Sequence, residues 1–266
     1  YTIDLKGTWQ YKVGVAFRPL RGGGGGGISA QNQPTALYNA MVAPETNYSI
    51  KGFCWYQGES NAGRPQEYAD LLPALIKDWR TKWNGESLPF LFVQLPGFMD
   101  YNYLPSESSW AILRESQLKA LSVPNTAMAV AIDLGEWNDI HPDNKKDVGE
   151  RLAQAAFKIA YGEDVVPTGP LFQSATVKGD KIEISFTHTG GGLTTNDGEA
   201  PAEFAIAGAD KRFVWAKTKI ENGKVVVWSE EVPDPLYVRY AWADNPVNPN
   251  LFNKEGLPAS PFRTDQ

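Results

Sequence analysis

Residues 50–61 have the sequence IKGFCWYQGESN, in which a mostly apolar run ends abruptly at Gln57. The run is rich in aromatic residues, which are enriched in β-strands. Gly58 follows, and it permits a sharp turn because it has no Cβ atom. We therefore predict a buried strand over residues 50–56 whose end carries polar side chains.

Two further apolar runs, at 89–95 and 127–133, have the same character. Between and after the three runs, apolar residues recur at helical spacing in three segments. In chain order, these residues are Tyr68, Leu71, Leu72, Leu75, Ile76 and Trp79; Trp110, Leu113 and Leu118; and Val148, Leu152, Ala155, Ala156 and Ile159. Strands that are apolar throughout and alternate with helices predict an α/β fold, with a parallel sheet covered by helices on both faces.

The composition changes on both sides of this α/β portion. Upstream, two short strand-like runs (1–5 and 9–13) precede six consecutive glycines at 22–27, a composition typical of flexible coil. Downstream of about residue 163, short strand-like runs separated by turn residues predict a small all-β, sandwich-like module. The predicted domains are an N-terminal strand segment with a glycine-rich linker, an α/β portion and a C-terminal β module, at residues 1–32, 33–163 and 164–266.

Charge and hydropathy argue against several classes of function. The net charge is −6 and no clustered basic face is visible, so we expect no nucleic-acid partner. The longest uninterrupted apolar run, 127–132, is too short to span a bilayer, so we expect no membrane segment. Cys54 is the only cysteine, which excludes a disulfide framework and a zinc site, and its apolar surroundings predict a buried, inert thiol.

Of the two histidines, His141 is the stronger catalytic candidate. It lies in a polar loop between the third predicted strand and the last predicted helix, two residues after Asp139. A carboxylate in that position can orient an imidazole and leave its other nitrogen free as a base. The same loop could instead be a helix-entry segment capped by Asp143 or Asn144. For His188, within the β module, we expect a structural role.

The polar block at the end of the first strand is the second candidate. The side-chain amide of Gln57 can donate a hydrogen bond to an oxyanion that develops beyond the strand end. Glu59 and Asn61 add an acceptor and a two-way hydrogen-bonding group, which suit sugar hydroxyls. The alternative interpretation is a polar loop that caps the next helix. Ser60 lacks the second glycine of the Gly-x-Ser-x-Gly elbow, so we do not assign it as a nucleophile.

Together these motifs resemble the sialate O-acetylesterases of the SGNH hydrolase superfamily. The blocks that carry the resemblance are PTALYNAM (34–41), IKG (50–52), WYQGESN (55–61), DWR (78–80), PF (89–90), VQL (93–95), LRE (113–115), DIHP (139–142), NK (144–145), VRYAW (238–242), GLPA (256–259) and PFR (261–263). The resemblance implies an SGNH-type α/β fold and hydrolysis of acetyl esters on sugars by a serine nucleophile, with no metal or organic cofactor. It implies that His141 is the base, that Gln57 contributes to the oxyanion hole, and that the protein is secreted or periplasmic.

Two features depart from the family pattern. The family's nucleophile lies in a Gly-Gln-Ser-Asn block, which this sequence lacks; its single Gln-Ser pair is at 173–174. Related hydrolases often place the acid three residues before the histidine, where this chain has Asn138, so Asp139 is the nearest carboxylate. The nucleophilic serine would then come from a partner chain, a cleaved segment or another part of the gene.

We expect O-acetylated sialic acid as the substrate, with acetylated xylan as the second choice. The alternative from another class is a non-catalytic carbohydrate-binding protein that has lost its nucleophile. A glycosidase that uses Asp133, Glu136 or Asp139 would need two carboxyl groups facing one scissile bond.

Overall fold

The computed structural model describes Ser29 and residues 33–266. The strands expected at 1–5 and 9–13, and the glycine run at 22–27, lie outside the described residues. The chain divides into two compact units, Tyr1–Glu45 and Thr46–Gln266. The described part of the first unit contains a single π-helical turn, η2 (Tyr38–Val42), followed by a 3-10 turn, η3 (Ala43–Glu45).

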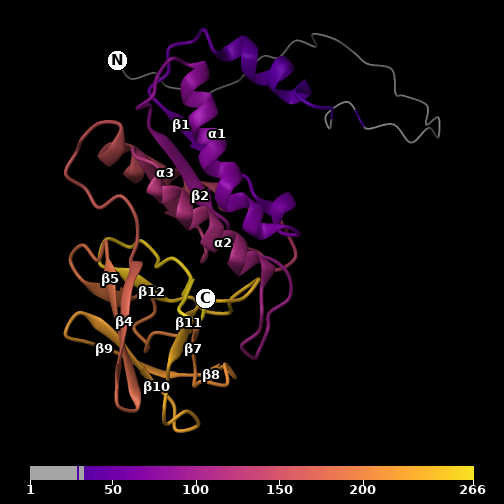
Figure 1. Cartoon of the computed structure of the whole chain (residues 1–266). Helices are drawn as coiled ribbons and strands as arrows, with labels where there is room; N and C mark the ends of the chain where they lie inside the picture. Colours follow the sequence, from indigo (N-terminus) through magenta and orange to yellow (C-terminus); the bar gives the residue numbers. More distant parts are fainter. Residues whose placement is uncertain (1–28, 30–32) are drawn as a thin grey trace. The chain divides into compact units, whose positions relative to one another are not determined.

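The second unit begins with alternating strands and helices, as the sequence predicts (Figure 1). Its parallel strands are β1 (Phe53–Trp55), β2 (Phe90–Gln94) and β3 (Thr126–Val130), in the spatial order β1-β2-β3. Its helices are α1 (Tyr68–Lys82), α2 (Ser109–Lys119) and α3 (Lys145–Ile159), with 3-10 turns η4 (Glu59–Asn61), η5 (Pro65–Glu67) and η6 (Ala120–Ser122). Among the described residues, no helix is long and apolar enough to cross a membrane.

Alternate side chains of β2 point to opposite faces of the sheet, because the side-chain period of a strand is two. Phe90 and Phe92 belong to a core that includes Ile76 of α1 and Leu113 of α2. On the other face, Leu91 packs in a separate cluster with residues of α3. Helices α1 and α2 therefore cover one face and α3 covers the other, as Figure 1 shows.

The rest of the unit is a sandwich-like β module, as predicted. One antiparallel sheet has the order β4-β5-β10-β9, with strands Leu171–Lys178, Lys181–Thr187, Lys224–Trp228 and Lys217–Glu221. A second has the order β13-β11-β7-β8, with strands Phe262–Arg263, Tyr237–Tyr240, Phe204–Ala207 and Val214–Trp215. The rings of Phe172 and Phe262 stack across the two sheets with their centres 4.4 Å apart. Strands β6 (Leu193–Thr195) and β12 (Leu251–Asn253) form a separate pair.

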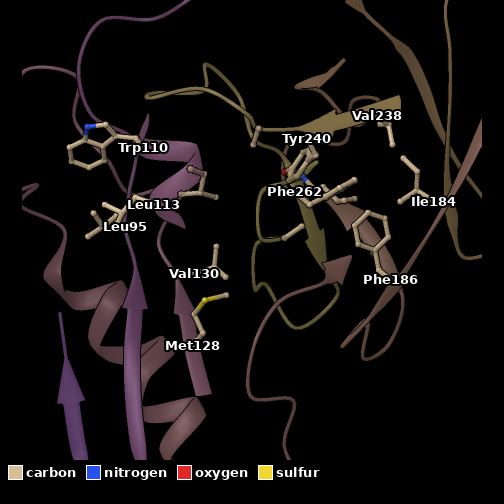
Figure 2. Close-up of a cluster of buried hydrophobic side chains, with 14 of the residues drawn as sticks. Leu95, Trp110, Leu113, Met128, Val130, Ile184, Phe186, Val238, Tyr240 and Phe262 are labelled. Carbon is tan, nitrogen blue, oxygen red and sulfur yellow. The ribbon is translucent and has the colours of Figure 1, made fainter. Parts of the chain in front are cut away.

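The parallel sheet and the β module share one apolar core. Figure 2 shows Met128 and Val130 of β3 in the same cluster as Tyr240 and Phe262 of the module. A buried hydrogen bond also joins the two parts, since Gln94 Nε2 of β2 donates to the Ser260 hydroxyl of the module at 2.9 Å.

Arg114, on α2, is the largest fully buried side chain of this interface. Its guanidinium donates to the backbone carbonyls of Leu95 and Pro96, at the end of β2, over 2.8 and 2.6 Å. It also donates to the carbonyls of Ala243 and Asp244, in the β module, over 2.8 and 2.7 Å. A single side chain thus holds the carboxyl end of β2 against the module.

Cys54 is exposed, so the prediction of a buried thiol is wrong. In the described part of the chain, β1 is an edge strand of the sheet, and Cys54 pairs in register with Leu91. Its side chain therefore points to the face that α3 covers at Leu91 and Ala127, but α3 packs against β2 and β3. An apolar run predicts a strand, whereas burial also depends on which elements cover that strand.

Candidate active site

The two polar blocks predicted to carry chemistry follow the outer strands of the parallel sheet at its carboxyl edge. Gln57 comes two residues after the end of β1, and His141 lies in the loop between β3 and α3. The ammonium group of Lys145, at the start of α3, lies 5.3 Å from the centre of the Tyr56 ring. The segments that carry Gln57 and His141 therefore meet at one edge, where open α/β sheets bind their ligands.

The side chain of Gln57 is held at both ends of its amide. Its Nε2 donates to Asn61 Oδ1 at 3.1 Å, and its Oε1 accepts from the Tyr68 hydroxyl at 2.9 Å. An amide nitrogen has two N–H groups, and the second N–H of Gln57 has no hydrogen-bond partner among the described residues. A fixed amide with one N–H to spare is a suitable donor to an oxyanion.

Tyr68 is a site residue that sequence reasoning missed, because it falls on the apolar stripe of α1. Its buried hydroxyl accepts a hydrogen bond from Trp55 Nε1 at 3.1 Å and lies 3.0 Å from the Gln57 carbonyl oxygen. Burial raises the pKa of Tyr68 to about 12, helped by the charge of Glu59 and opposed by the Trp55 hydrogen bond. The phenol is therefore protonated at neutral pH and can donate to Gln57. The one indication in the sequence was that Tyr68 carries a hydroxyl group, whereas the aliphatic residues of the same helical stripe have no polar atom.

Gln117 of α2 also holds the polar block that begins at Gln57. Its Nε2 lies 3.3 Å from the Gln57 carbonyl oxygen and 3.2 Å from that of Val93, and its Oε1 accepts from the Leu95 N–H at 3.0 Å. A Cβ atom at Gly58 would lie 3.1 Å from Gln117 Nε2. Gly58 thus leaves room for Gln117, and a larger residue would require the Gln117 side chain to shift.

The His141 loop is braced by its own carboxylates. Asp139 Oδ1 accepts from the backbone N–H of His141 at 2.7 Å, and Glu136 Oε1 accepts from that of Asp143 at 2.7 Å. Asn144 caps α3 through the N–H of Asp147 at 3.2 Å, as the helix-entry interpretation predicts. The imidazole of His141 is exposed. In this structure the Asp139 carboxylate contacts the backbone of His141, and its role in orienting the ring stays a prediction.

The loop after β2 reaches the same edge. A Cβ atom at Gly135 would lie 2.0 Å from the Gly97 carbonyl oxygen, so the loops after β2 and β3 can pack together only because residue 135 is glycine. Met99 N–H then donates to the Trp137 carbonyl at 3.1 Å, which adds a backbone contact between the two loops.

The remaining polar residues have less direct roles. Asp133 forms a paired contact with Arg151 over 2.6 and 2.7 Å, and Glu136 and Asp139 each accept a backbone N–H within the loop, so all three carboxylates make structural contacts. Ser60 is exposed in η4, beside Glu59. Among the described residues, no three His, Cys, Asp or Glu side chains gather so that they could hold a metal ion.

Comparison with known proteins decides the family. A family model described as "Carbohydrate esterase, sialic acid-specific acetylesterase" matches residues 20–158, which is more than half of the chain. The chain belongs to this family. Among curated relatives, the sialate O-acetylesterase of Mus musculus is 37% identical over 163 residues, covering 54% of this chain and 30% of the relative. The sialate O-acetylesterase of Homo sapiens is 28% identical over 262 residues, covering 88% of this chain and 50% of the relative.

A solved structure of a carbohydrate acetylesterase from Xanthomonas citri is 45% identical to this esterase-family chain, with a TM-score of 0.83. The match covers 90% of this chain and 56% of that protein. It confirms the predicted combination of a helix-flanked parallel sheet with antiparallel sheets. The chain spans about half the length, or less, of the relatives that it matches.

Proposed function

We propose that this chain provides the general base and the oxyanion-binding amide of a carbohydrate esterase that removes O-acetyl groups from sugars. The observation that carries the proposal is the meeting of two polar blocks at one sheet edge, where Lys145 contacts Tyr56. One block contributes a fixed amide, Gln57, and the other an exposed imidazole, His141. Membership of the carbohydrate esterase family supports the same chemistry.

In the proposed reaction, His141 takes the proton of a serine hydroxyl while the serine oxygen attacks the acetyl carbonyl carbon. The second N–H of Gln57 donates to the oxyanion of the tetrahedral intermediate. The imidazolium then gives its proton to the departing sugar oxygen, which leaves an acetyl-serine. In the second half, His141 takes a proton from water, the resulting hydroxide attacks the acetyl group, and the proton returns to the serine as acetate leaves.

Neighbouring residues would position these groups and contact the sugar. Asp139 would position His141 through the hydrogen bond that the Asp139 carboxylate accepts from the His141 backbone N–H. Glu59 would accept hydrogen bonds from sugar hydroxyls. Asn61 would have two functions, because its oxygen already holds Gln57 while its own NH₂ group can donate to a hydroxyl.

We propose that the nucleophilic serine lies outside these 266 residues, on a further segment or a partner chain. Two observations support this. The sequence has no Gly-Gln-Ser-Asn block. The N–H of Phe53 donates toward β2, to the Pro89 carbonyl, so the backbone groups of Cys54 point away from β2 and can pair with an additional strand.

O-acetylated sialic acid is the first proposed substrate, since the curated relatives are sialate O-acetylesterases. Acetylated xylan is the second, since the similar solved structure is called a carbohydrate acetylesterase with no sialic acid in its description.

The test is acetate release from O-acetylated sialic acid and from acetylated xylan, by the full product of the gene and by the 266-residue chain. We expect turnover by the full product, no serine-dependent turnover by the chain alone, and loss of turnover in His141→Ala. A full product that binds these sugars without releasing acetate would favour the non-catalytic alternative.

A further inference from the structure

The β module contains a groove of about 580 Å³ that is built from residues other than the Gln57 and His141 blocks. Its walls come from the segment before β7, from β8 and β9, and from the end of β10. The volume lies within the range of pockets that hold small ligands. The residues that define its chemistry are Glu203, Trp215, Lys217, Thr218 and Trp228.

Two tryptophans line the groove. Trp215 is 39% exposed, although its indole N–H donates to the Tyr103 carbonyl at 2.9 Å. The ring is therefore held at one edge while part of its surface stays open. Trp228 is half-buried, and it pairs across the sheet with Lys217, so both side chains rise from the same face. Indole rings combine an apolar surface with a polar edge, which suits a ligand that has both kinds of surface.

The polar groups of the groove are mostly acceptors. Glu203 adopts a left-handed backbone conformation (φ 62°), which is rare for a residue other than glycine and is often kept at binding sites. Its Oε1 accepts from the Asn248 N–H at 3.2 Å, and a carboxylate has further lone pairs for ligand hydroxyls. The Thr218 hydroxyl donates to the Pro201 carbonyl, which leaves its oxygen free to accept.

The charges of the groove do not favour a charged ligand. Lys217 forms a solvent-exposed ion pair with Glu230 at 2.7 Å, so a carboxylate already lies beside its ammonium group. The remaining carboxylate, Glu203, would repel the phosphates of a nucleic acid and the carboxylate of a sialic acid. Neutral pyranose units have apolar C–H faces that stack on indole rings and hydroxyls that donate to carboxylate and hydroxyl oxygens.

We propose that the Trp215–Trp228 groove binds neutral sugar units of a polysaccharide. Tyr103, which fixes Trp215, belongs to the same inter-element segment as Met99, which contacts the His141 loop. One segment thus joins the groove to the candidate active edge. If the proposed esterase function holds, the groove would retain a polymeric substrate while acetyl groups are removed elsewhere along it; the binding itself does not rest on that function.

The test is binding of soluble unsubstituted xylan and of a soluble β-glucan to the purified chain, measured by affinity electrophoresis. Xylan without acetyl groups is not a substrate of the proposed esterase reaction, so its retardation reports binding alone. Retardation by at least one of the two polymers is expected. Trp215→Ala should weaken it at least tenfold, while Trp215→Phe, which keeps a ring, should weaken it less. Tyr161→Ala is the control, since this aromatic side chain is 63% exposed and lies outside the groove and outside the Gln57 and His141 blocks.

Melting temperatures show whether each variant is folded, and Glu203→Gln gives a second probe that leaves the aromatic rings in place. Failure of the unchanged chain to bind either polymer would overturn the proposal. So would unchanged binding in both Trp215→Ala and Glu203→Gln, or an equal loss in Tyr161→Ala. If no form of the protein released acetate but Trp215→Ala still lost polymer binding, the esterase proposal would fail and the groove would stand.

Discussion

Lys145 lies over the ring of Tyr56, with its ammonium nitrogen 5.3 Å from the ring centre. Tyr56 precedes Gln57, and Lys145 lies four residues after His141, so this contact fixes one side of the site against the other. A cation over an aromatic face contributes about 0.5–1 kcal/mol at partly exposed positions. This contribution to the free energy of unfolding is small, but the contact joins the two segments that must act on one ester.

We predict that Lys145→Ala lowers acetyl-ester turnover several-fold in an active form of the protein while the free energy of unfolding falls by about 1 kcal/mol or less. Steady-state kinetics and denaturant melts would measure the two effects. Lys146→Ala is the control, because Lys146 is exposed and, among the described residues, forms its ion pairs with Asp147 and Glu150 on its own helix. Equal losses of turnover in both variants would mean that the Tyr56 contact does not position the site.

Tyr68→Phe removes the hydroxyl that links Trp55 to Gln57. Because buried polar groups then lose a partner, we expect a loss of about 1–3 kcal/mol in unfolding free energy. Turnover should fall about tenfold, because the Gln57 amide is no longer fixed. Tyr161→Phe, at a tyrosine that is 63% exposed, should leave both quantities unchanged. A Tyr68→Phe variant with normal turnover would show that Asn61 alone holds the amide.

The same tyrosine predicts an alkaline effect. Burial raises the pKa of Tyr68 to about 12, above its ordinary value near 10, so the unfolded chain releases this proton first. Stability should therefore fall as pH rises from about 10 to about 12, with Tyr68 contributing on the order of 2 kcal/mol. Denaturant melts of Tyr68→Phe across this range should show a shallower decline than those of the unchanged protein.

For Asp139, the structure predicts a difference between two substitutions. The carboxylate accepts a hydrogen bond from the backbone N–H of His141, and an asparagine oxygen can accept the same bond. Asp139→Ala should thus lower turnover by one to two orders of magnitude, and Asp139→Asn by less. Asp143→Ala is the control, because Asp143 donates its backbone N–H to Glu136, and alanine keeps that N–H. If Asp139→Asn were as damaging as Asp139→Ala, the negative charge itself, acting on the imidazole, would be what matters.

Arg114 should be the most sensitive position for stability. Its guanidinium donates to four carbonyl groups, two from the end of β2 and two from the β module, and three of these bonds are buried. Arg114→Met should cost about 3–5 kcal/mol in unfolding free energy, since those carbonyls lose their donors. The surface variant Arg64→Met should cost less than about 0.5 kcal/mol. A small loss in Arg114→Met would mean that the shared apolar core alone holds the module to the sheet.

The helices and parallel strands could be predicted because their apolar residues recur with a clear period. The end of β1 at Gln57 could be predicted for the same reason. The exposure of Cys54 could not, since it depends on α3 packing against β2 and β3 and not on the sequence around the cysteine.

Within the site, the residue types were informative and the contacts were not. Asp139 and His141 were identified together, but nothing in the sequence distinguishes a bond to the imidazole from one to the backbone N–H. Tyr68 was hidden by the helical stripe in which it lies. In the β module, short strands such as β6 and β12 pair across more than fifty residues, and no local pattern indicates such partners.

We propose that His141 serves as the base for a serine supplied from outside these 266 residues. Labelling the full gene product with a serine-directed fluorophosphonate, with the modified residue located by peptide mass spectrometry, tests it most directly. We expect one labelled serine beyond this chain and at least a hundredfold slower labelling in His141→Ala, because the hydroxyl then has no base. Stoichiometric label on Ser60, or on any other serine of this chain, would contradict it.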